Sequence, residues 1–185
     1  MPIFLITLGI LGVIILYIWS LYNSLIREST EIDEAWSQID VQLKRRADLI
    51  PNIVATVKGY AKHEKGVLEE VTKARSALMK ADTPAKSAAA NDMLSGALKS
   101  LFAVAENYPQ LKANENFLQL QKELSDTEDK VAYARQYYNT QLMEYNVKVK
   151  VFPNTIIATM FGFKEKEFFK AEEGERKAVK VDLGQ

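Results

Sequence analysis

Cysteine is absent from this 185-residue chain, and histidine occurs once, at position 63. The lack of cysteine excludes disulfides, thiol catalysis and Cys-ligated metals. A di-metal site in a helical bundle takes a Glu-x-x-His pair from each of two helices, which a single histidine cannot supply. We therefore expect His63 to be a surface residue near a helix junction, and we predict no metal site and no cofactor.

Several catalytic signatures are also missing. The sequence has no Gly-rich phosphate loop, no nucleophile elbow and no paired-carboxylate motif. Lys plus Arg and Asp plus Glu are balanced at 24 each, so the basic excess that nucleic-acid binding requires is absent. We predict no catalytic residues, a protein that is not an enzyme, and no nucleic-acid partner.

Glycine and proline are sparse, with 8 and 5 residues, and this favours helix. The segment from Ile3 to Tyr22 is apolar, and the first charged side chain is Arg27. About 20 helical residues cross the hydrocarbon core of a bilayer, so residues 1–22 are predicted to form a transmembrane anchor. Three aromatic residues near its end are predicted to contact the membrane: Tyr17, Trp19 and Tyr22.

A cleaved signal peptide is the alternative for this segment. Its flank has no basic residue, its apolar run is too long, and no A-x-A site follows, so we favour an uncleaved anchor. Arg27 and the later basic residues lie on the C-terminal side of the span. Counting basic residues places the N-terminus outside and the rest of the chain in the cytoplasm.

The remaining sequence reads as four helices. Between Val13 and Ile50 there is no Gly or Pro, so the anchor continues into the first soluble helix, and Pro51 is expected to kink that helix without ending it. Three further helices are predicted over residues 66–81, 84–107 and 114–149. Thr83 and Asn114 are suitable N-cap residues for the last two. The predicted fold class is all-α.

Several motifs resemble the LemA family. They are Tyr22-Asn23-Ser24-Leu25, QLKRRADLIPN at 42–52, VKGYAKHE at 57–64, ENYPQLKAN at 106–114, the segment 134–139, Glu144-Tyr145-Asn146 and Val151-Phe152-Pro153. The resemblance implies an N-terminal transmembrane helix continuous with an up-and-down antiparallel four-helix bundle. It implies no known enzymatic activity and no catalytic residues. The expected domains are an anchor at 1–22, a LemA-like bundle at 23–150 and an aromatic and charged tail at 151–185.

The predicted helix lengths suggest an incomplete bundle. The soluble first helix and the fourth span roughly 55 Å each, whereas the second and third span only about 25 and 35 Å. The two long helices should therefore pair largely alone near the membrane and leave apolar surface for another subunit. We predict a homo-oligomer interface at Ile32, Trp36, Ile39, Tyr138, Leu142 and Tyr145.

An even number of antiparallel helices returns the chain to the bilayer near Val149. The tail then mixes aromatic and Lys side chains, which suits a membrane interface. The predicted membrane contacts there are Ile156, Ile157, Met160, Phe161 and Phe163. Packing of these residues on the bundle or on a neighbouring subunit is the alternative.

The most distinctive charged cluster is Arg45, Arg46 and Asp48, preceded by Lys44. Asp48 lies one helical turn from Lys44 and Arg45, which favours intrahelical pairs. Arg46 lies between the inward residues Leu43 and Ala47, so it needs a partner such as Glu123, Asp126 or Glu128. A structural salt bridge is favoured over an anionic-ligand site.

The function that these observations favour is a non-enzymatic, membrane-anchored scaffold that self-assembles at the bilayer and organises or shapes it. The alternative is an adaptor or regulator of another membrane protein, such as a membrane protease or an envelope-stress component. The expected partners are the lipid bilayer, further copies of the chain and a possible membrane-protein client. The expected location is the inner (cytoplasmic) membrane of a bacterium, crossed once.

Overall fold

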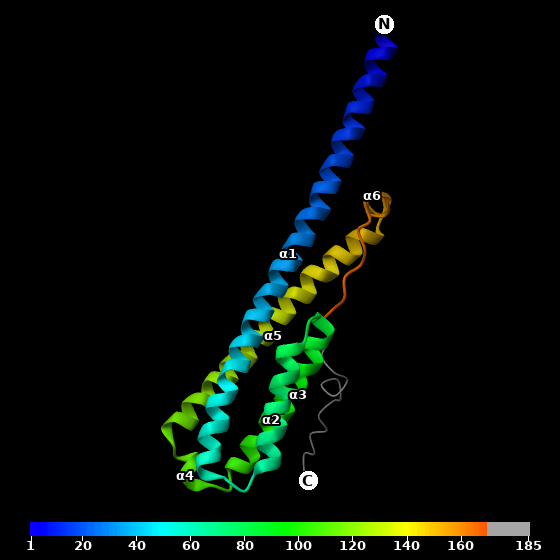
Figure 1. The fold of residues 1–185 in the computed structure, drawn as a ribbon. Coiled ribbons are helices and arrows are strands. Elements are labelled where there is room, and N and C mark those ends of the chain that lie inside the picture. The colour runs from blue at the N-terminus through cyan, green and yellow to red at the C-terminus, as the bar shows by residue number, and fades with distance from the viewer. Residues whose placement is uncertain (170–185) are drawn as a thin grey trace, which may run out of the picture. The chain divides into compact units, whose positions relative to one another are not determined.

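The computed structural model describes residues 1–169, and these contain helices and no strand. The helices are α1 (Pro2–Tyr60), α2 (Lys65–Lys80), α3 (Pro84–Ala105), α4 (Pro109–Lys112), α5 (Glu115–Lys150) and α6 (Asn154–Phe161) (Figure 1). The all-α prediction is confirmed. Residues 170–185 of the predicted tail domain lie outside the described residues.

α1 contains the predicted anchor and the first soluble helix without interruption. Its N-terminal part is long and apolar enough to cross a membrane, and none of its most apolar window is buried. That exposure distinguishes it from the core helix of a water-soluble protein. Pro51 lies inside α1 and does not end it, as the sequence predicted.

The chain divides into two compact units. Unit 1 comprises Met1–Gln38 and Gln136–Glu167, and unit 2 comprises, among the described residues, Ile39–Arg135, Phe168 and Phe169. α1 and α5 each contribute to both units. Each unit is described below by itself.

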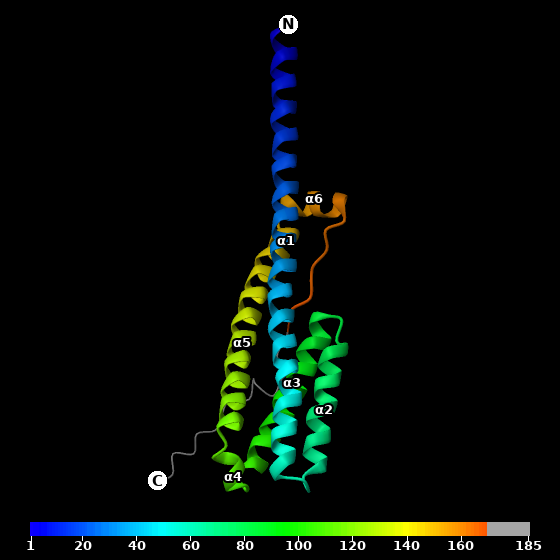
Figure 2. The ribbon, with the colours of Figure 1, turned by 60° about the vertical axis from the view of Figure 1, so that its left-hand side comes forward.

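Unit 2 brings together α2, α3, α4 and parts of α1 and α5. α2 and α3 pack directly against each other (Figures 1 and 2). The core of this unit is aliphatic and alanine-rich, and its fully buried side chains include Ile53, Val71, Leu94, Leu101 and Leu124. Small residues let helices approach closely, which accounts for the buried alanines of α3.

Local capping sets the helix ends in unit 2. The Thr83 side chain accepts a hydrogen bond from the Lys86 amide at 3.3 Å, with Pro84 in the first helical position. The Asn114 side chain accepts one from the Phe117 amide at 3.0 Å. Both predicted caps are confirmed. The single-turn α4 was not predicted, because the stretch between Tyr108-Pro109 and Asn114 reads as a connection.

Unit 1 takes its residues from α1, α5, α6 and residues 162–167. α6 begins after Pro153 and ends at Gly162, whose φ of 76° lies in the left-handed region that glycine adopts without strain. Residues 163–167, here called the return segment, then run beside α1 and α5. The sequence predicted neither α6 nor this return.

Candidate functional site

Lys166 fastens the return segment to both long helices of unit 1. Its ammonium donates to Asp33 at 2.6 Å and to the Ser29 carbonyl at 3.1 Å on α1, and it lies 5.9 Å from the centroid of the Tyr145 ring on α5. Its backbone is bound by Asn146, whose side chain donates to the Lys166 carbonyl and accepts from the Lys166 amide, each at 3.0 Å. Three segments that are distant in sequence meet at this residue.

Tyr138 holds the next residue of the return segment. Its hydroxyl donates to the Glu167 carbonyl at 3.0 Å, and its ring lies 6.0 Å from that of Trp36. Burial, reinforced by the carboxylates of Asp33 and Glu167, raises the pKa of Tyr138 to about 12. Burial also raises the pKa of Tyr145, with Asp33 and Glu28 acting in the same direction. Lys148 binds Ser24 and Glu28 across the same pair of helices.

The side chains predicted to contact another subunit are mostly buried within the monomer. Five of them are buried, and Trp36 is half-buried: Ile32, Ile39, Tyr138, Leu142 and Tyr145. The helix lengths predicted that the two long helices pair largely alone near the membrane. In the structure, the return segment also covers Tyr138 and Tyr145 there. A subunit contact through these six side chains stays a prediction, and their burial counts against it.

A different apolar surface is exposed in unit 1. Met143 and Val147 are each more than half exposed, and Tyr137 and Val151 are close to half exposed. Met143, Val147 and Val151 recur at four-residue spacing along one side of α5, and Val151 follows its last residue, with its amide still bound to the Val147 carbonyl at 3.0 Å. We call these three residues the α5 stripe. They were not predicted as a contact surface, because the periodic apolar residues that the sequence shows most clearly in this helix are the inward-facing ones.

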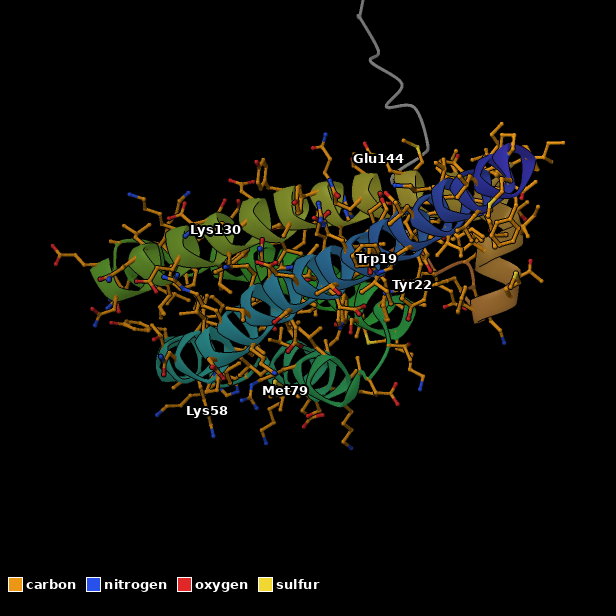
Figure 3. The ribbon with its side chains drawn as sticks, turned by 90° about the horizontal axis from the view of Figure 1, so that it is seen from above. Trp19, Tyr22, Lys58, Met79, Lys130 and Glu144 are labelled. Atoms are coloured by element: carbon orange, nitrogen blue, oxygen red, sulfur yellow. The ribbon has the colours of Figure 1, made fainter. Side chains whose placement is uncertain are left out.

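The predicted membrane-contact residues divide between two environments. Tyr17, Trp19, Ile156, Met160 and Phe161 are exposed, and Tyr22 and Phe163 are half-buried. Trp19 and Tyr22 are marked on α1 in Figure 3. Ile157 is 4% exposed and faces the protein, so it is not available to lipid in this structure. Phe152, which was not among the predicted membrane contacts, is 78% exposed.

The charged cluster of α1 lies in unit 2, and only Arg46 enters the core. Arg45 and Asp48 are exposed, and Lys44 pairs with Asp40 at 2.6 Å instead of with Asp48 as the spacing suggested. Arg46 is 1% exposed and lies 3.4 Å from Glu128, one of its three predicted partners. The sequence did not predict its second partner, Asn91, whose Oδ1 accepts at 2.6 Å.

Burial lowers the pKa of Arg46, while the carboxylates of Glu128 and Asp92 act in the opposite direction. Its Nε has no hydrogen-bond partner among the described residues. The arrangement joins α1, α3 and α5 through one cation, which fits the predicted structural role. Asn91 lies in the alanine-rich run of α3, and a mid-helix asparagine is its only sequence signal.

The hydrogen bond that Pro51 removes from α1 is replaced by one from α2. Proline has no N–H, so the carbonyl four residues earlier, that of Ala47, loses its helical donor. The Arg75 side chain of α2 donates to that carbonyl through Nε at 2.8 Å. The break in the hydrogen-bond ladder of α1 thus becomes an attachment point for α2.

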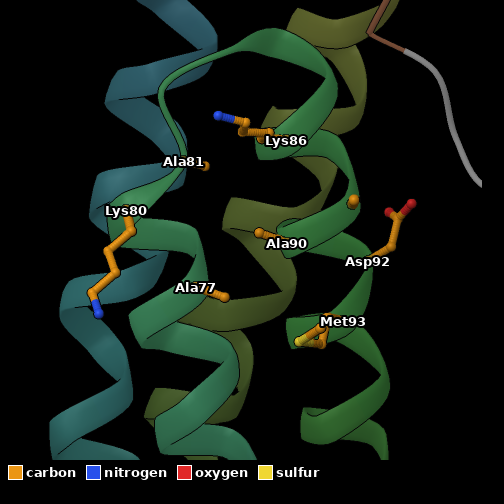
Figure 4. Close-up of a pocket in the computed structure, with 8 residues that line it drawn as sticks. Ala77, Lys80, Ala81, Lys86, Ala90, Asp92 and Met93 are labelled. Carbon is orange, nitrogen blue, oxygen red and sulfur yellow. The ribbon is translucent and has the colours of Figure 1, made fainter.

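Hollows lie beside α3 in unit 2. One, of about 670 Å³, is lined mainly by α3 and α5 and includes Arg46, Lys99 and Glu106. Another, of about 550 Å³, lies between α2 and α3 beside Lys80, Lys86 and Met93 (Figure 4). In the first, the Ser95 hydroxyl donates to the Glu128 carboxylate at 3.1 Å, and the same carboxylate pairs with Arg46. Residues 1–169 bring together no group of three or more His, Asp and Glu side chains that would hold a metal.

A model of the LemA family matches residues 35–183. Protein LemA of Metamycoplasma hominis is 31% identical over 88% of this chain and 74% of its own length. Magnetosome protein MamQ 2 of Paramagnetospirillum magneticum is 25% identical over 80% of this chain. MamQ of Magnetospirillum gryphiswaldense is 24% identical over the same share. This chain spans 64% of either magnetosome protein's length.

Proposed function

Since the chain belongs to the LemA family, we propose that it is a non-enzymatic scaffold anchored in a membrane by residues 1–22. The observation that carries this proposal is the continuity of α1, whose exposed apolar part runs into the packed part without a break. The packed part of α1 therefore follows the span directly, with no linker between them. Unit 2 is interpreted as an up-and-down antiparallel four-helix bundle, within the proposed domain at 23–150.

The proposed scaffold assembles with further copies of itself through the α5 stripe. Exposed apolar side chains that share one helix side favour burial against a partner, and Met143, Val147 and Val151 form such a set. A second copy of the chain offers the same stripe, so an isologous contact is available. This surface replaces the buried residues from which the sequence analysis argued.

The mass of the full-length protein in detergent and in nanodiscs, measured by light scattering and mass photometry, tests self-assembly. A defined multimer is expected for the natural sequence. The double substitution Met143→Lys and Val147→Lys should reduce the mass, because it places like charges opposite each other between copies. Val41→Lys is the matched control, since Val41 is similarly exposed on α1 in unit 2.

A monomer for the natural sequence would contradict self-assembly. The exposed stripe would then favour the adaptor role, in which another membrane protein covers it. Loss of assembly in Val41→Lys as well would assign the contact to a different surface. The expected location is the inner membrane of a bacterium, with the N-terminus outside and the bundle at residues 23–150 in the cytoplasm.

A further inference from the structure

We propose that α6 is a second membrane contact, lying in the headgroup region where α1 leaves the bilayer. Its apolar patch, defined as Phe152, Ile156, Met160 and Phe161, would enter the boundary between headgroups and acyl chains. The inference rests on the proposed anchoring of residues 1–22. It adds a second, non-spanning element that meets the lipid.

The position of α6 relative to the span is set by aromatic contacts within unit 1. The Phe161 ring centroid lies 4.7 Å from that of Tyr22, and the Phe163 ring centroid lies 5.8 Å from it. Tyr22 is the last residue of the predicted span. The C-terminal end of α6 is therefore held beside the residue at which the span ends, as the placement of α6 next to α1 illustrates (Figure 2).

The two sides of α6 differ sharply in exposure. Asn154, Ile157 and Ala158 are buried against the protein. Phe152, Ile156 and Met160, spaced by four residues, are 78%, 50% and 69% exposed. The helix itself contains no charged residue. Its outer side thus presents apolar atoms with no charge to hold them in water.

The return segment keeps α6 in this place. Asn146 pairs with both backbone groups of Lys166, and the Lys166 ammonium binds Asp33 of α1. A helix of eight residues is too short to persist alone in water, so its position depends on these attachments. The patch is held outward while the opposite side stays packed.

The bilayer is the occupant that the surroundings favour. The exposed side chains of the span, such as Ile18 and Trp19, belong to the same unit as the patch. The span ends at Tyr22, and the ring of Phe161, a member of the patch, lies against the Tyr22 ring. The patch therefore continues an apolar surface that the proposed anchoring already places in lipid. Aromatic and aliphatic side chains beside a polar boundary are typical of interfacial helices.

The absence of cysteine permits a direct test on the full-length chain in nanodiscs of phosphatidylcholine and phosphatidylglycerol. A nitroxide is attached to Met160→Cys, to Ile10→Cys within the span, and to Met93→Cys, which is exposed on α3 in unit 2. Collision with oxygen, which concentrates in lipid, is compared with collision with a water-soluble nickel chelate. For Met160→Cys the oxygen-to-nickel ratio should exceed that of Met93→Cys by roughly fivefold or more.

The three labels separate the possible failures. A water-like ratio at Met160→Cys, with a lipid-like ratio at Ile10→Cys, would overturn this inference and leave the anchor intact. A water-like ratio at Ile10→Cys would overturn the proposed anchoring itself. Exclusion of both reagents from Met160→Cys would show that protein covers the patch, and this too would overturn the lipid contact.

Discussion

Arg46 shows how a single buried charge is compensated in this chain. Its guanidinium is held between the neutral amide of Asn91 and the partly exposed carboxylate of Glu128. Removing a partner from a buried cation costs more than the pair contributes, because the charge remains without compensation. The side chain thus makes the junction of α1, α3 and α5 sensitive to small changes.

Asn91→Ala is expected to lower the free energy of unfolding by about 1–3 kcal/mol, the cost of leaving a buried donor unpaired. Urea unfolding of the detergent-solubilised protein, followed by circular dichroism, measures the effect. Asp40→Asn is the control, since it removes an exposed ion pair and should change little. Equal stability of the two variants would contradict the structural role of the Arg46 contact.

The raised pKa of Tyr138 predicts that the stability of the fold decreases at alkaline pH. Its pKa is raised to about 12 in the folded chain, above the ordinary value of 10. The unfolded chain therefore loses this proton first, and the contribution of Tyr138 to stability, complete below pH 10, is lost as pH rises towards about 12.

Melting temperatures of the natural sequence and Tyr138→Phe should therefore converge between pH 10 and 12. At pH 8 the variant should be less stable by about 0.5–1.5 kcal/mol, the usual contribution of one hydrogen bond. Tyr137→Phe, at a half-exposed neighbour, controls for tyrosine number. A gap between Tyr138→Phe and the natural sequence that stays constant to pH 12 would rule out the raised pKa.

At the scale of an element, α1 tolerates Pro51 because another helix supplies the missing donor. The Ala47 carbonyl accepts from Arg75 of α2 in place of a backbone N–H. Arg75 and Pro51 should therefore depend on each other energetically through the Ala47 carbonyl.

A double-mutant cycle tests this dependence. Arg75→Met alone should cost about 1–3 kcal/mol, because the Ala47 carbonyl is left unsatisfied. In the Pro51→Ala background the loss should be smaller, since residue 51 then supplies an N–H to the same oxygen. Unfolding free energies of the four proteins give the coupling, and strict additivity would refute the exchange of donors.

The hydrogen bonds of the return segment should protect its backbone amides from hydrogen exchange. Asn146→Ala removes both hydrogen bonds to Lys166, so the Lys166 amide should exchange faster by at least about tenfold, the factor that corresponds to 1.4 kcal/mol. Hydrogen exchange read by mass spectrometry over residues 162–169 measures it. Asn52→Ala, at an exposed helical position, should leave this segment unchanged.

At the scale of the whole molecule, the helices were predictable because their signals are local. Thr83, Asn114 and Pro84 define ends through neighbours a few residues away, and the periodicity of α1 marks its buried side. The cover over Tyr138 and Tyr145 was not predictable, because it comes from Glu167 and Lys166, which lie 29 and 21 positions further along the chain. Likewise, the acidic partner of Arg46 was foreseen, whereas Asn91 carries no charge that would suggest it.

The orientation of the chain in the membrane is a further prediction. With the N-terminus outside, Met93→Cys and Met79→Cys should be unreactive toward a membrane-impermeant maleimide in intact cells and reactive after permeabilisation. Both residues are exposed, so burial would not mask them. Labelling of both in intact cells would reverse the topology and leave the helical structure unaffected.

The uninterrupted course of α1 also fixes a rotational phase. Each residue turns an α-helix by about 100°, so the side of the span that faces any neighbour in the bilayer determines the direction in which residues 23–38 of the same helix face. Two residues inserted after Tyr22 would rotate the span by about 200°, while seven would nearly restore its phase. Any rotation of the span within the bilayer is thus passed on to the part of α1 outside it.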